Sequence, residues 1–202
     1  AGTGKGGRVM PRALVVFAHP CEESFSSALH GATLSALAKG GWEVDDCDLY
    51  AEGFSPILTA QERRDYHDTA INTAPVQGYV DRLRAADALV LVFPVWNFGY
   101  PAILKGFFDR VFLPCVSFTL GEERLKPCLD NIRKIATITT YGATPMRAFL
   151  AGDPPRKLIK RAVWGVTKAK KVRYLALHDM NNATQAKREG FLARVSTEMA
   201  AF

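Results

Sequence analysis

Short apolar runs alternate with helical patterns along most of the chain. Continuous runs of aliphatic and β-branched residues occupy residues 12–18, 89–93, 134–140 and 171–177, and a more polar, weakly alternating segment occupies residues 42–48. Runs of this length and composition are typical of β-strands, and a strand without polar positions is typical of a sheet centre buried on both faces. We therefore predict five strands, with residues 89–93 at the centre of the sheet and residues 42–48 at an edge.

The segments between these strands place their apolar residues at helical spacing. Helices are predicted to begin at Ser24 and Thr59, because both side chains are good N-caps, and near Pro101, because proline is tolerated at the first helical position. Pro94 has no N–H to give to a sheet ladder, so it is expected to stop the central strand. Further helical patterns cover residues 76–86, 102–113, 154–166 and 184–202; residues 63–75 are expected to form a surface excursion and residues 114–129 a long connection.

Strands that alternate with helices predict an α/β fold with a doubly wound parallel sheet. No internal repeat or second domain is visible, so residues 11–202 are expected to form a single domain. Residues 1–10 (AGTGKGGRVM) are expected to be a flexible leader left from expression, with a native start at Met10. If the strand order is 2-1-3-4-5, a ligand site is expected at the carboxyl ends of the first and third strands, where the order reverses.

The loop after the central strand combines aromatic side chains with backbone groups that lack a strand partner. Trp96, Phe98 and Tyr100 offer flat apolar faces, and the N–H groups of residues 95–98 are expected to be free. A planar ligand with a polar rim would satisfy both kinds of group, so we interpret this loop as the site of a flavin ring. The alternative is that the aromatic side chains only plug the sheet edge beneath the following helix.

Hydroxyl side chains gather after the first strand. That strand ends at His19, and Ser24, Ser26 and Ser27 surround the start of the next helix. Free N–H groups and the positive end of the helix dipole form a physically sound cradle for a phosphate. The alternative is that these serines only cap the helix.

A third loop reaches the same edge of the predicted sheet. The fourth strand delivers residues 139–144 there; Gly142 permits a ligand to approach the backbone closely, and the threonines offer hydroxyl partners. A phosphate cradle beside a pocket for a planar ring is what a flavin nucleotide needs. The three loops therefore predict a flavin-nucleotide site.

Composition narrows the classes of protein. The hydrophobic fraction of 48% and the charged fraction of 23% are ordinary for a globular protein. No apolar run approaches the ~20 residues that a membrane helix needs, so no stable membrane insertion is expected. Cys21, Cys47, Cys115 and Cys128 form no C-x-x-C pair and have no metal-ligand spacing, so we expect reduced thiols, no metal site and a cytoplasmic location.

Four stretches carry a resemblance to a known family, and with their spacing they cover most of residues 13–142: LVVFAHPCEESFSSAL, GWEVDDCDLYAEGFSPIL, FPVWNFGYPAILKGFFDRVF and TITTYG. In them the chain resembles the flavodoxin-like NAD(P)H:quinone oxidoreductases, that is, the DT-diaphorase type and its bacterial relatives. The resemblance implies a flavodoxin-like, five-stranded parallel sheet of order 2-1-3-4-5 and a homodimer. It further implies a bound FAD or, in relatives, FMN, and transfer of a hydride from NAD(P)H to quinones.

The same resemblance assigns cofactor contacts to the three loops. The phosphate and ribityl loop corresponds to His19, Ser24, Phe25 and Ser26, the loop around the flavin ring to Pro94, Val95, Trp96, Asn97, Phe98 and Gly99, and the loop on its pyrimidine side to Thr139, Thr140, Tyr141 and Gly142. Ser26 stands where the family commonly has an asparagine, and Tyr141 where the DT-diaphorase type has a glycine.

Two further departures concern catalysis and assembly. The DT-diaphorase type uses a tyrosine and a histidine during flavin reduction, and the corresponding residues here are Arg147 and Asp153. Two aromatic residues that reach the partner subunit's pocket correspond to Phe118 and Leu120, so only Phe118 is expected to lie near the partner's flavin.

The predicted catalytic residues are Asn97, Tyr141, Gly142 and Arg147. Backbone N–H groups of the first three would stabilise negative charge on the reduced flavin. Arg147 would take over from the tyrosine and histidine that the DT-diaphorase type uses, by pairing with the anionic flavin or with a substrate carbonyl. The alternative is that Arg147 is a solvated surface arginine. One pocket shared by nicotinamide and quinone implies ping-pong kinetics.

Some alternatives stay open at the level of the sequence. Two rival functions are a flavodoxin-type electron carrier and a regulatory flavoprotein subunit of a membrane transporter. The sequence also does not decide between FAD and FMN as the cofactor, or between NADH and NADPH as the reductant. The net charge of +6 includes a basic run of Arg156, Lys157, Lys160, Arg161, Lys168, Lys170, Lys171 and Arg173. This run is either a solvated face or a patch for the NADPH phosphate; nucleic-acid binding is not expected, because no reader motif accompanies the charge.

Overall fold

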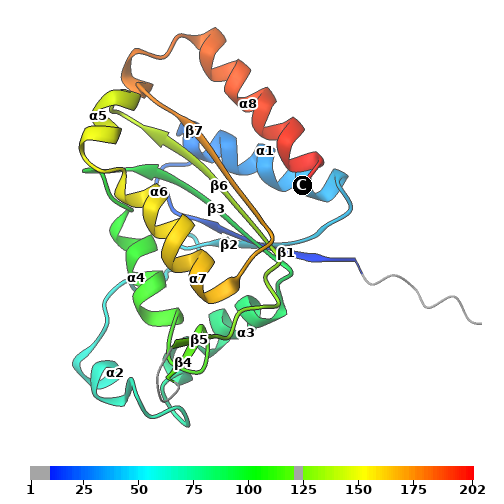
Figure 1. The fold of residues 1–202 in the computed structure, drawn as a ribbon. Helices are drawn as coiled ribbons and strands as arrows, with labels where there is room; N and C mark the ends of the chain where they lie inside the picture. Colours follow the sequence, from blue (N-terminus) through cyan, green and yellow to red (C-terminus); the bar gives the residue numbers. More distant parts are fainter. Residues whose placement is uncertain (1–9, 121–124) are drawn as a thin grey trace, which may run out of the picture.

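The computed structural model describes residues 10–120 and 125–202, so the predicted leader lies outside the described residues except for Met10 (Figure 1). Five parallel strands form the central sheet: β1 Arg12–Phe17, β2 Glu43–Asp48, β3 Ala88–Val95, β6 Lys134–Tyr141 and β7 Lys171–Leu177. Their order is β2-β1-β3-β6-β7, which in this sheet's own numbering is 2-1-3-4-5. The predicted fold class, strand positions and order are confirmed.

Helices cover both faces of the sheet (Figure 1). α1 Phe25–Lys39 and α8 Gln185–Ala200 pack together on one face. The other face carries α3 Gln77–Ala85, α4 Ala102–Val111 and a continuous helical segment built from α6 Pro154–Leu158, a π-helical turn Ile159–Val163 and α7 Trp164–Thr167. Shorter elements are α2 Ala60–Asp65, α5 Pro145–Leu150 and 3₁₀ turns at Ala74–Val76 and Met180–Asn182. No helix within the described residues is both long and apolar enough to cross a membrane.

The hydrophobic core consists of two clusters, one on each side of the sheet. Successive residues of β3 point to opposite clusters: Leu89 and Leu91 face α4, whereas Val90 and Val92 face α1 and α8. All four side chains are fully buried. This double burial explains why the central strand is apolar at every position and could be predicted from the sequence.

Pro94 does not stop the central strand, so that prediction was wrong. β3 continues through Pro94 and Val95, which pair with Thr140 and Tyr141 of β6. The Val92 carbonyl accepts the Ala18 N–H on the β1 side, and strand alternation places the Pro94 nitrogen on that same side, beyond the last residue of β1. The proline therefore removes no ladder hydrogen bond.

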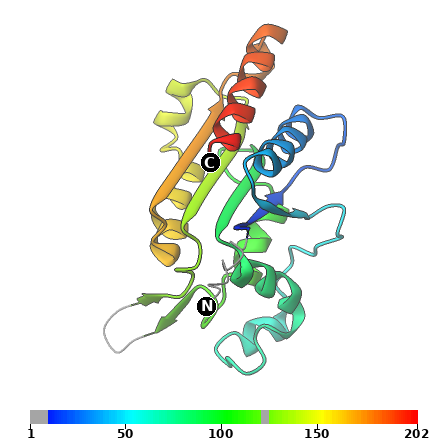
Figure 2. The same ribbon diagram turned by 90° about the vertical axis from the view of Figure 1, so that its right-hand side faces the viewer.

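The predicted long connection contains a two-stranded antiparallel hairpin, β4 Phe118–Leu120 and β5 Leu125–Pro127, which protrudes from the body of the molecule (Figure 2). The predicted surface excursion begins as the last turn of α2. Within it Asn72 is buried, and its side-chain amide donates to the carbonyls of Tyr66 and Pro114. The bond to Pro114 links the excursion to the connection after α4.

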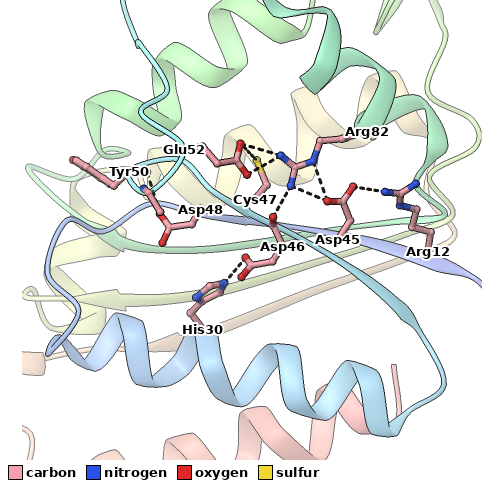
Figure 3. Close-up of polar contacts among 10 residues, drawn as sticks. Arg12, His30, Asp45, Asp46, Cys47, Asp48, Tyr50, Glu52 and Arg82 are labelled. Carbon is pink, nitrogen blue, oxygen red and sulfur yellow. Dashed lines mark hydrogen bonds and ion pairs between the residues drawn. The ribbon is translucent and has the colours of Figure 1, made fainter.

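The edge strand β2 is acidic, and two arginines neutralise it (Figure 3). Arg82 donates to Asp45 at 2.9 Å and to Glu52 at 2.8 Å, and Arg12 donates to the other oxygen of Asp45 at 3.0 Å. Cys47 lies beneath this network, and burial raises its pKa to about 12. Charges on the edge discourage pairing with another strand, and the buried thiol is unreactive.

Candidate active site

Three loops meet at the carboxyl edge of the sheet, as the strand order predicts. A pocket of about 200 Å³ lies between the β3–α4 and β6–α5 loops, and its walls are Val95, Asn97, Phe98, Tyr141, Gly142 and Ala143. The β1–α1 loop adjoins the pocket, because the His19 ring meets the Trp96 ring edge-on at 5.7 Å. Loops distant in the sequence are thus brought together at one rim.

The aromatic loop is a tight turn with an unusual backbone. Trp96 and Gly99 form an antiparallel bridge, and between them Asn97 and Phe98 both have positive φ, 49° and 56°. Two consecutive left-handed residues are what a two-residue type I′ turn requires. Asparagine tolerates this conformation, but a phenylalanine in it is strained. Such strain persists where the surrounding structure enforces it, and it is typical of ligand-binding sites.

This turn corrects the predicted set of free donors. Val95 belongs to β3, and the Trp96 N–H donates to the Gly99 carbonyl. Among the residues that the structure describes, the N–H groups of Asn97 and Phe98 have no acceptor. The free donors are therefore two adjacent N–H groups at the tip of the turn.

The aromatic side chains of the loop were predicted either to bind a ligand or to plug the sheet edge, and the structure shows both arrangements. Tyr100 turns inward: it packs on Phe93 at 5.0 Å and donates its hydroxyl hydrogen to the Pro155 carbonyl at 2.6 Å. Trp96 and Phe98 stay 40% and 39% exposed. Tyr100 thus plugs the sheet edge, whereas Trp96 and Phe98 are available to a ligand.

The first loop presents defined donors. The Nδ1 atom of His19 accepts the Cys21 N–H at 3.0 Å, so the hydrogen of the ring is on Nε2, which remains as a donor. Ser24 caps α1, since its Oγ accepts the Ser27 N–H at 3.1 Å, so the capping interpretation holds for this hydroxyl. The Ser26 side chain is buried. The donors left for an anion are the first N–H groups of α1, those of Phe25 and Ser26.

A second, more polar pocket of about 370 Å³ lies beside this loop, and the sequence did not predict it. Its walls come from the ends of β1 and β2 and from α1: Phe17, His19, Pro20, Glu22, Ser27, His30, Asp48, Tyr50 and Ala51. One oxygen of Asp48 accepts the N–H groups of Tyr50 and Ala51, and His30 pairs with Asp46 at 2.8 Å (Figure 3). The feature of the sequence that could have indicated this pocket is Asp48, which ends the strand next to the loop that carries the serines.

The third loop presents fewer side chains than predicted. Thr139 is fully buried, and its hydroxyl has no partner within the described part of the chain; Thr140 is 7% exposed. The Thr139 hydroxyl is therefore not at the rim. At Gly142 an added Cβ would come no closer to another atom than 3.7 Å, to the Asn181 amide nitrogen, so nothing in the local packing demands a glycine there.

Tyr141 points inward from the end of β6 and is 1% exposed. Its hydroxyl lies 2.7 Å from Asp153 Oδ1 and 2.6 Å from the Tyr174 hydroxyl, and its ring stacks on His178 at 4.4 Å. Burial is the main cause that raises the pKa of both tyrosines above the usual value. Burial also lowers the pKa of His178, with a further contribution from Arg156. Around neutral pH these rings are uncharged.

Arg147 and Asp153, which correspond to the tyrosine and the histidine of the DT-diaphorase type, lie in different surroundings. Arg147 is on the exposed side of α5, and within the described residues its side chain has no polar partner. Asp153 is held by Tyr141 and by Arg156, whose Nε lies 2.9 Å from Oδ2. Arg147 is thus available to a ligand, whereas Asp153 is engaged within the protein.

A third hollow, of about 220 Å³, lies between α4 and the helical segment of residues 154–167. Phe108, Phe112, Phe118, Leu158, Val163 and Val166 line it, with the Lys105–Asp109 ion pair at its margin. Phe118 therefore lies in an apolar surface depression.

The basic run does not form one patch. Arg156 pairs with Asp153, Arg173 pairs with Glu198, and Lys168 lies over the Trp164 ring at 4.5 Å. Lys160 and Arg161 are exposed on the π-helical turn. Part of the run thus has structural partners inside the domain.

Comparison with known proteins adds the following similarities. Residues 11–199 match the model of a family described as having a flavodoxin-like fold. NAD(P)H dehydrogenase (quinone) 1 of Rattus norvegicus is 34% identical over 151 residues, which are 67% of this chain but 55% of the rat protein. FMN-dependent NADH:quinone oxidoreductase 3 of Bacillus cereus is 27% identical over 171 residues, 81% of this chain and 73% of that protein. The structure of NAD(P)H:quinone oxidoreductase from Methanothermobacter marburgensis superposes with a TM-score of 0.82 at 25% identity, over 95% of this chain and 98% of that one.

Proposed function

The chain belongs to the family with the flavodoxin-like fold, and from this premise we propose that it is a flavin-dependent NAD(P)H:quinone oxidoreductase. The chain spans about half the length of the rat quinone dehydrogenase that it resembles, so the activity is argued from the site. The observation that carries the proposal is the turn at Asn97 and Phe98. It holds two free N–H donors and two exposed aromatic rings on the side of a pocket whose other wall is Tyr141, Gly142 and Ala143.

The residues present fit a flavin. Its ring would lie between two walls: the aromatic turn Trp96–Gly99, which follows Pro94 and Val95 of β3, and the end of β6 at Tyr141 and Gly142. Thr139 and Thr140 are buried in β6 and would support this wall from behind. Its phosphate would meet His19 Nε2–H and the start of α1 at Ser24, Phe25 and Ser26. A bound flavin supplies the chemistry of accepting a hydride from a nicotinamide and passing two electrons to a quinone.

The chain's own contribution to catalysis is positioning and charge stabilisation. The N–H groups of Asn97 and Phe98 are fixed by the strained turn before any ligand binds, so they can stabilise negative charge without reorganising. The backbone of Tyr141 and Gly142 would play the same role from the other wall. Arg147 adds a positive charge at the rim, where it would pair with anionic flavin or with the acceptor's carbonyl oxygen.

We propose FAD as the cofactor, with FMN as the alternative. The polar pocket beside the first loop supports FAD, because Asp48 at the end of β2 can accept hydrogen bonds from a ribose and the partly exposed Tyr50 ring can stack on a base. The name of the Bacillus cereus relative favours FMN. Heat release of the bound cofactor and its identification by mass distinguishes the two.

Nicotinamide and quinone would use the same pocket in turn, so ping-pong kinetics are expected. The test is steady oxidation of NADH or NADPH by the purified protein with 1,4-benzoquinone as acceptor. Parallel double-reciprocal lines support one shared site, whereas intersecting lines contradict it. A protein that is colourless and takes up neither FAD nor FMN would overturn the proposed function, and a flavoprotein without turnover would point to an electron carrier.

A homodimer completes the proposal. The apolar hollow at Phe118 and the outer face of α4 would be covered by a second copy, which places Phe118 near the partner's flavin pocket. The four free cysteines support a cytoplasmic location.

A further inference from the structure

Residues 142–152 connect the end of β6 to Asp153, the N-cap residue of α6. They carry α5 at the rim, beyond the ends of β3 and β6 (Figure 1). The two ends of the segment are joined by the hydrogen bond between the Tyr141 hydroxyl and Asp153 Oδ1. The segment is thus a closed loop whose closure is a side-chain contact.

The closing contact is partly buried and has several supports. The Tyr141 side chain is 1% exposed, and the Asp153 side chain 19%. Arg156 neutralises the second carboxylate oxygen and lies over the Tyr174 ring at 4.7 Å. Asp153 itself has a positive φ of 44°, a left-handed conformation that aspartate tolerates better than most residues.

Within the described residues, the segment buries little of its apolar surface between its two ends. Of the apolar side chains of α5, Ala148 is buried, whereas Met146, Phe149 and Leu150 are 66%, 76% and 75% exposed. A helix of six residues is too short to be stable by itself. Beyond the Tyr141–Asp153 contact, the Ala143 carbonyl accepts the Asp179 N–H at 3.0 Å. The Asp153 N–H also donates to the Ala148 carbonyl of α5 at 2.9 Å. The position of α5 therefore depends on a few contacts, of which Asp153 makes two.

The segment also forms part of the ligand site. Gly142 and Ala143 are walls of the pocket, and α5 follows them directly. Its outer surface offers large apolar side chains next to the positive charge of Arg147. That combination suits a planar, mostly apolar acceptor with carbonyl oxygens.

We propose that the Tyr141–Asp153 hydrogen bond is the clasp that holds residues 142–152 as the outer wall of the pocket, so that Tyr141 and Asp153 are positioning residues for the quinone acceptor. The inference rests on the proposed function for the identity of the acceptor. The clasp is a property of the protein alone and can be measured without flavin.

The test compares Tyr141→Phe with Tyr174→Phe. The first substitution removes the clasp; the second removes a hydroxyl from the same buried group but leaves the Tyr141–Asp153 bond in place. Amide hydrogen exchange of residues 142–152 is measured in flavin-free and flavin-loaded protein, together with flavin content and with KM and kcat for menadione. Tyr141→Phe is expected to speed exchange about tenfold in this segment alone and to raise the KM for menadione by a similar factor, with a smaller change in kcat. Tyr174→Phe is expected to do neither.

Asp153→Asn provides a rescue control, because an amide oxygen still accepts the Tyr141 hydrogen bond and asparagine tolerates positive φ. Because the substitution also removes the ion pair with Arg156, its exchange rate and KM are expected to lie much closer to wild type than to Tyr141→Phe. Unchanged exchange in Tyr141→Phe, or equal effects of Tyr141→Phe and Tyr174→Phe, would overturn the clasp. Faster exchange with an unchanged KM would overturn the positioning role. Failure of the proposed function is distinguishable, since it would appear as absent flavin and absent turnover in the wild type.

Discussion

Trp96 and Gly99 exchange two backbone hydrogen bonds: the Trp96 N–H donates to Gly99 at 3.2 Å and the Gly99 N–H donates to Trp96 at 2.8 Å. This closure forces the two residues between them into the left-handed region. The two hydrogen bonds use the N–H groups of Trp96 and Gly99. The N–H groups of Asn97 and Phe98, which lie between them, therefore stay free for a ligand. Backbone strain and ligand binding are therefore linked in one four-residue unit.

The role of Asn97 is predicted to lie in its backbone. Asn97→Gly keeps the left-handed conformation, so flavin affinity and turnover should stay close to wild type. Asn97→Val places a β-branched residue at φ 49° and should destabilise the fold by about 1–2 kcal/mol and weaken flavin binding. Thermal denaturation and flavin titration of the two variants test this. A strong loss of binding in Asn97→Gly would instead assign the role to the side-chain amide.

Gly142→Ala is predicted to separate folding from ligand binding. The new methyl group would meet no protein atom closer than 3.7 Å, so the flavin-free variant should be as stable as wild type. At the pocket wall the same methyl group would occupy space that a close ligand needs, and flavin affinity should fall by about tenfold, equivalent to about 1.4 kcal/mol. Gly78→Ala on α3 is the control: the site is open, the helix should gain up to about 1 kcal/mol, and flavin binding should not change. Unchanged affinity in Gly142→Ala would move the ligand away from this wall.

The sequence was sufficient to predict the strands of the sheet and their order, but not the direction in which several side chains point. Strands buried on both faces leave continuous apolar runs, and capping residues such as Ser24 and Thr59 mark helix starts locally. Pro94 was misjudged because the effect of a proline depends on whether its nitrogen faces a neighbouring strand, which is a tertiary property. The β4–β5 hairpin was missed because each of its strands has 3 residues, too few for an alternating pattern to be recognised.

The site was predicted to the level of loops but not of individual groups. Strand order brings the three loops to one rim, and the order follows from the alternation of elements. Whether Thr139 faces inward depends on the register of β6, and the direction of the Tyr100 side chain depends on the tight turn that precedes it. The contact between Tyr141 and Asp153 depends on the path of the intervening segment, which has no repeating pattern.

Arg147 is predicted to act on the bound ligand rather than on the fold. Its side chain is exposed and has no protein partner in the described part of the chain, so Arg147→Ala should leave stability and flavin content unchanged. Turnover should fall by about three- to tenfold if the guanidinium pairs with developing negative charge. Arg161→Ala, on the π-helical turn, is the matched control and should keep full turnover. Equal turnover in both variants would make Arg147 a solvated surface residue.

Stability above pH 9 is predicted to depend on Cys47. In the unfolded chain its thiol ionises near pH 9.0, whereas burial raises the pKa to about 12 in the folded protein. Because the folded state keeps a proton that the unfolded state releases, stability falls as pH rises through this window, by up to about 1.4 kcal/mol per pH unit. The measurement is the free energy of unfolding of wild type minus that of Cys47→Ala, which cancels the other titrating groups. This difference should be constant below pH 8 and shrink above pH 9; a constant difference throughout would show that the thiol reaches water.

The hollow beside α4 is predicted to be the contact between two copies. Phe118 lines it together with Phe108 and Phe112, so a charge introduced there would have to be desolvated in a dimer but not in a monomer. Phe118→Glu should therefore yield a folded monomer where wild type is a dimer, as measured by sedimentation velocity. Leu125→Glu is the control on the same hairpin, because Leu125 is 64% exposed and does not line the hollow; it should stay dimeric. If the proposed function also holds, the monomer should lose turnover more than flavin, since the partner's Phe118 would then be missing from each pocket. A wild type that sediments as a monomer at micromolar concentration, or a dimer that survives Phe118→Glu, would place the assembly surface elsewhere.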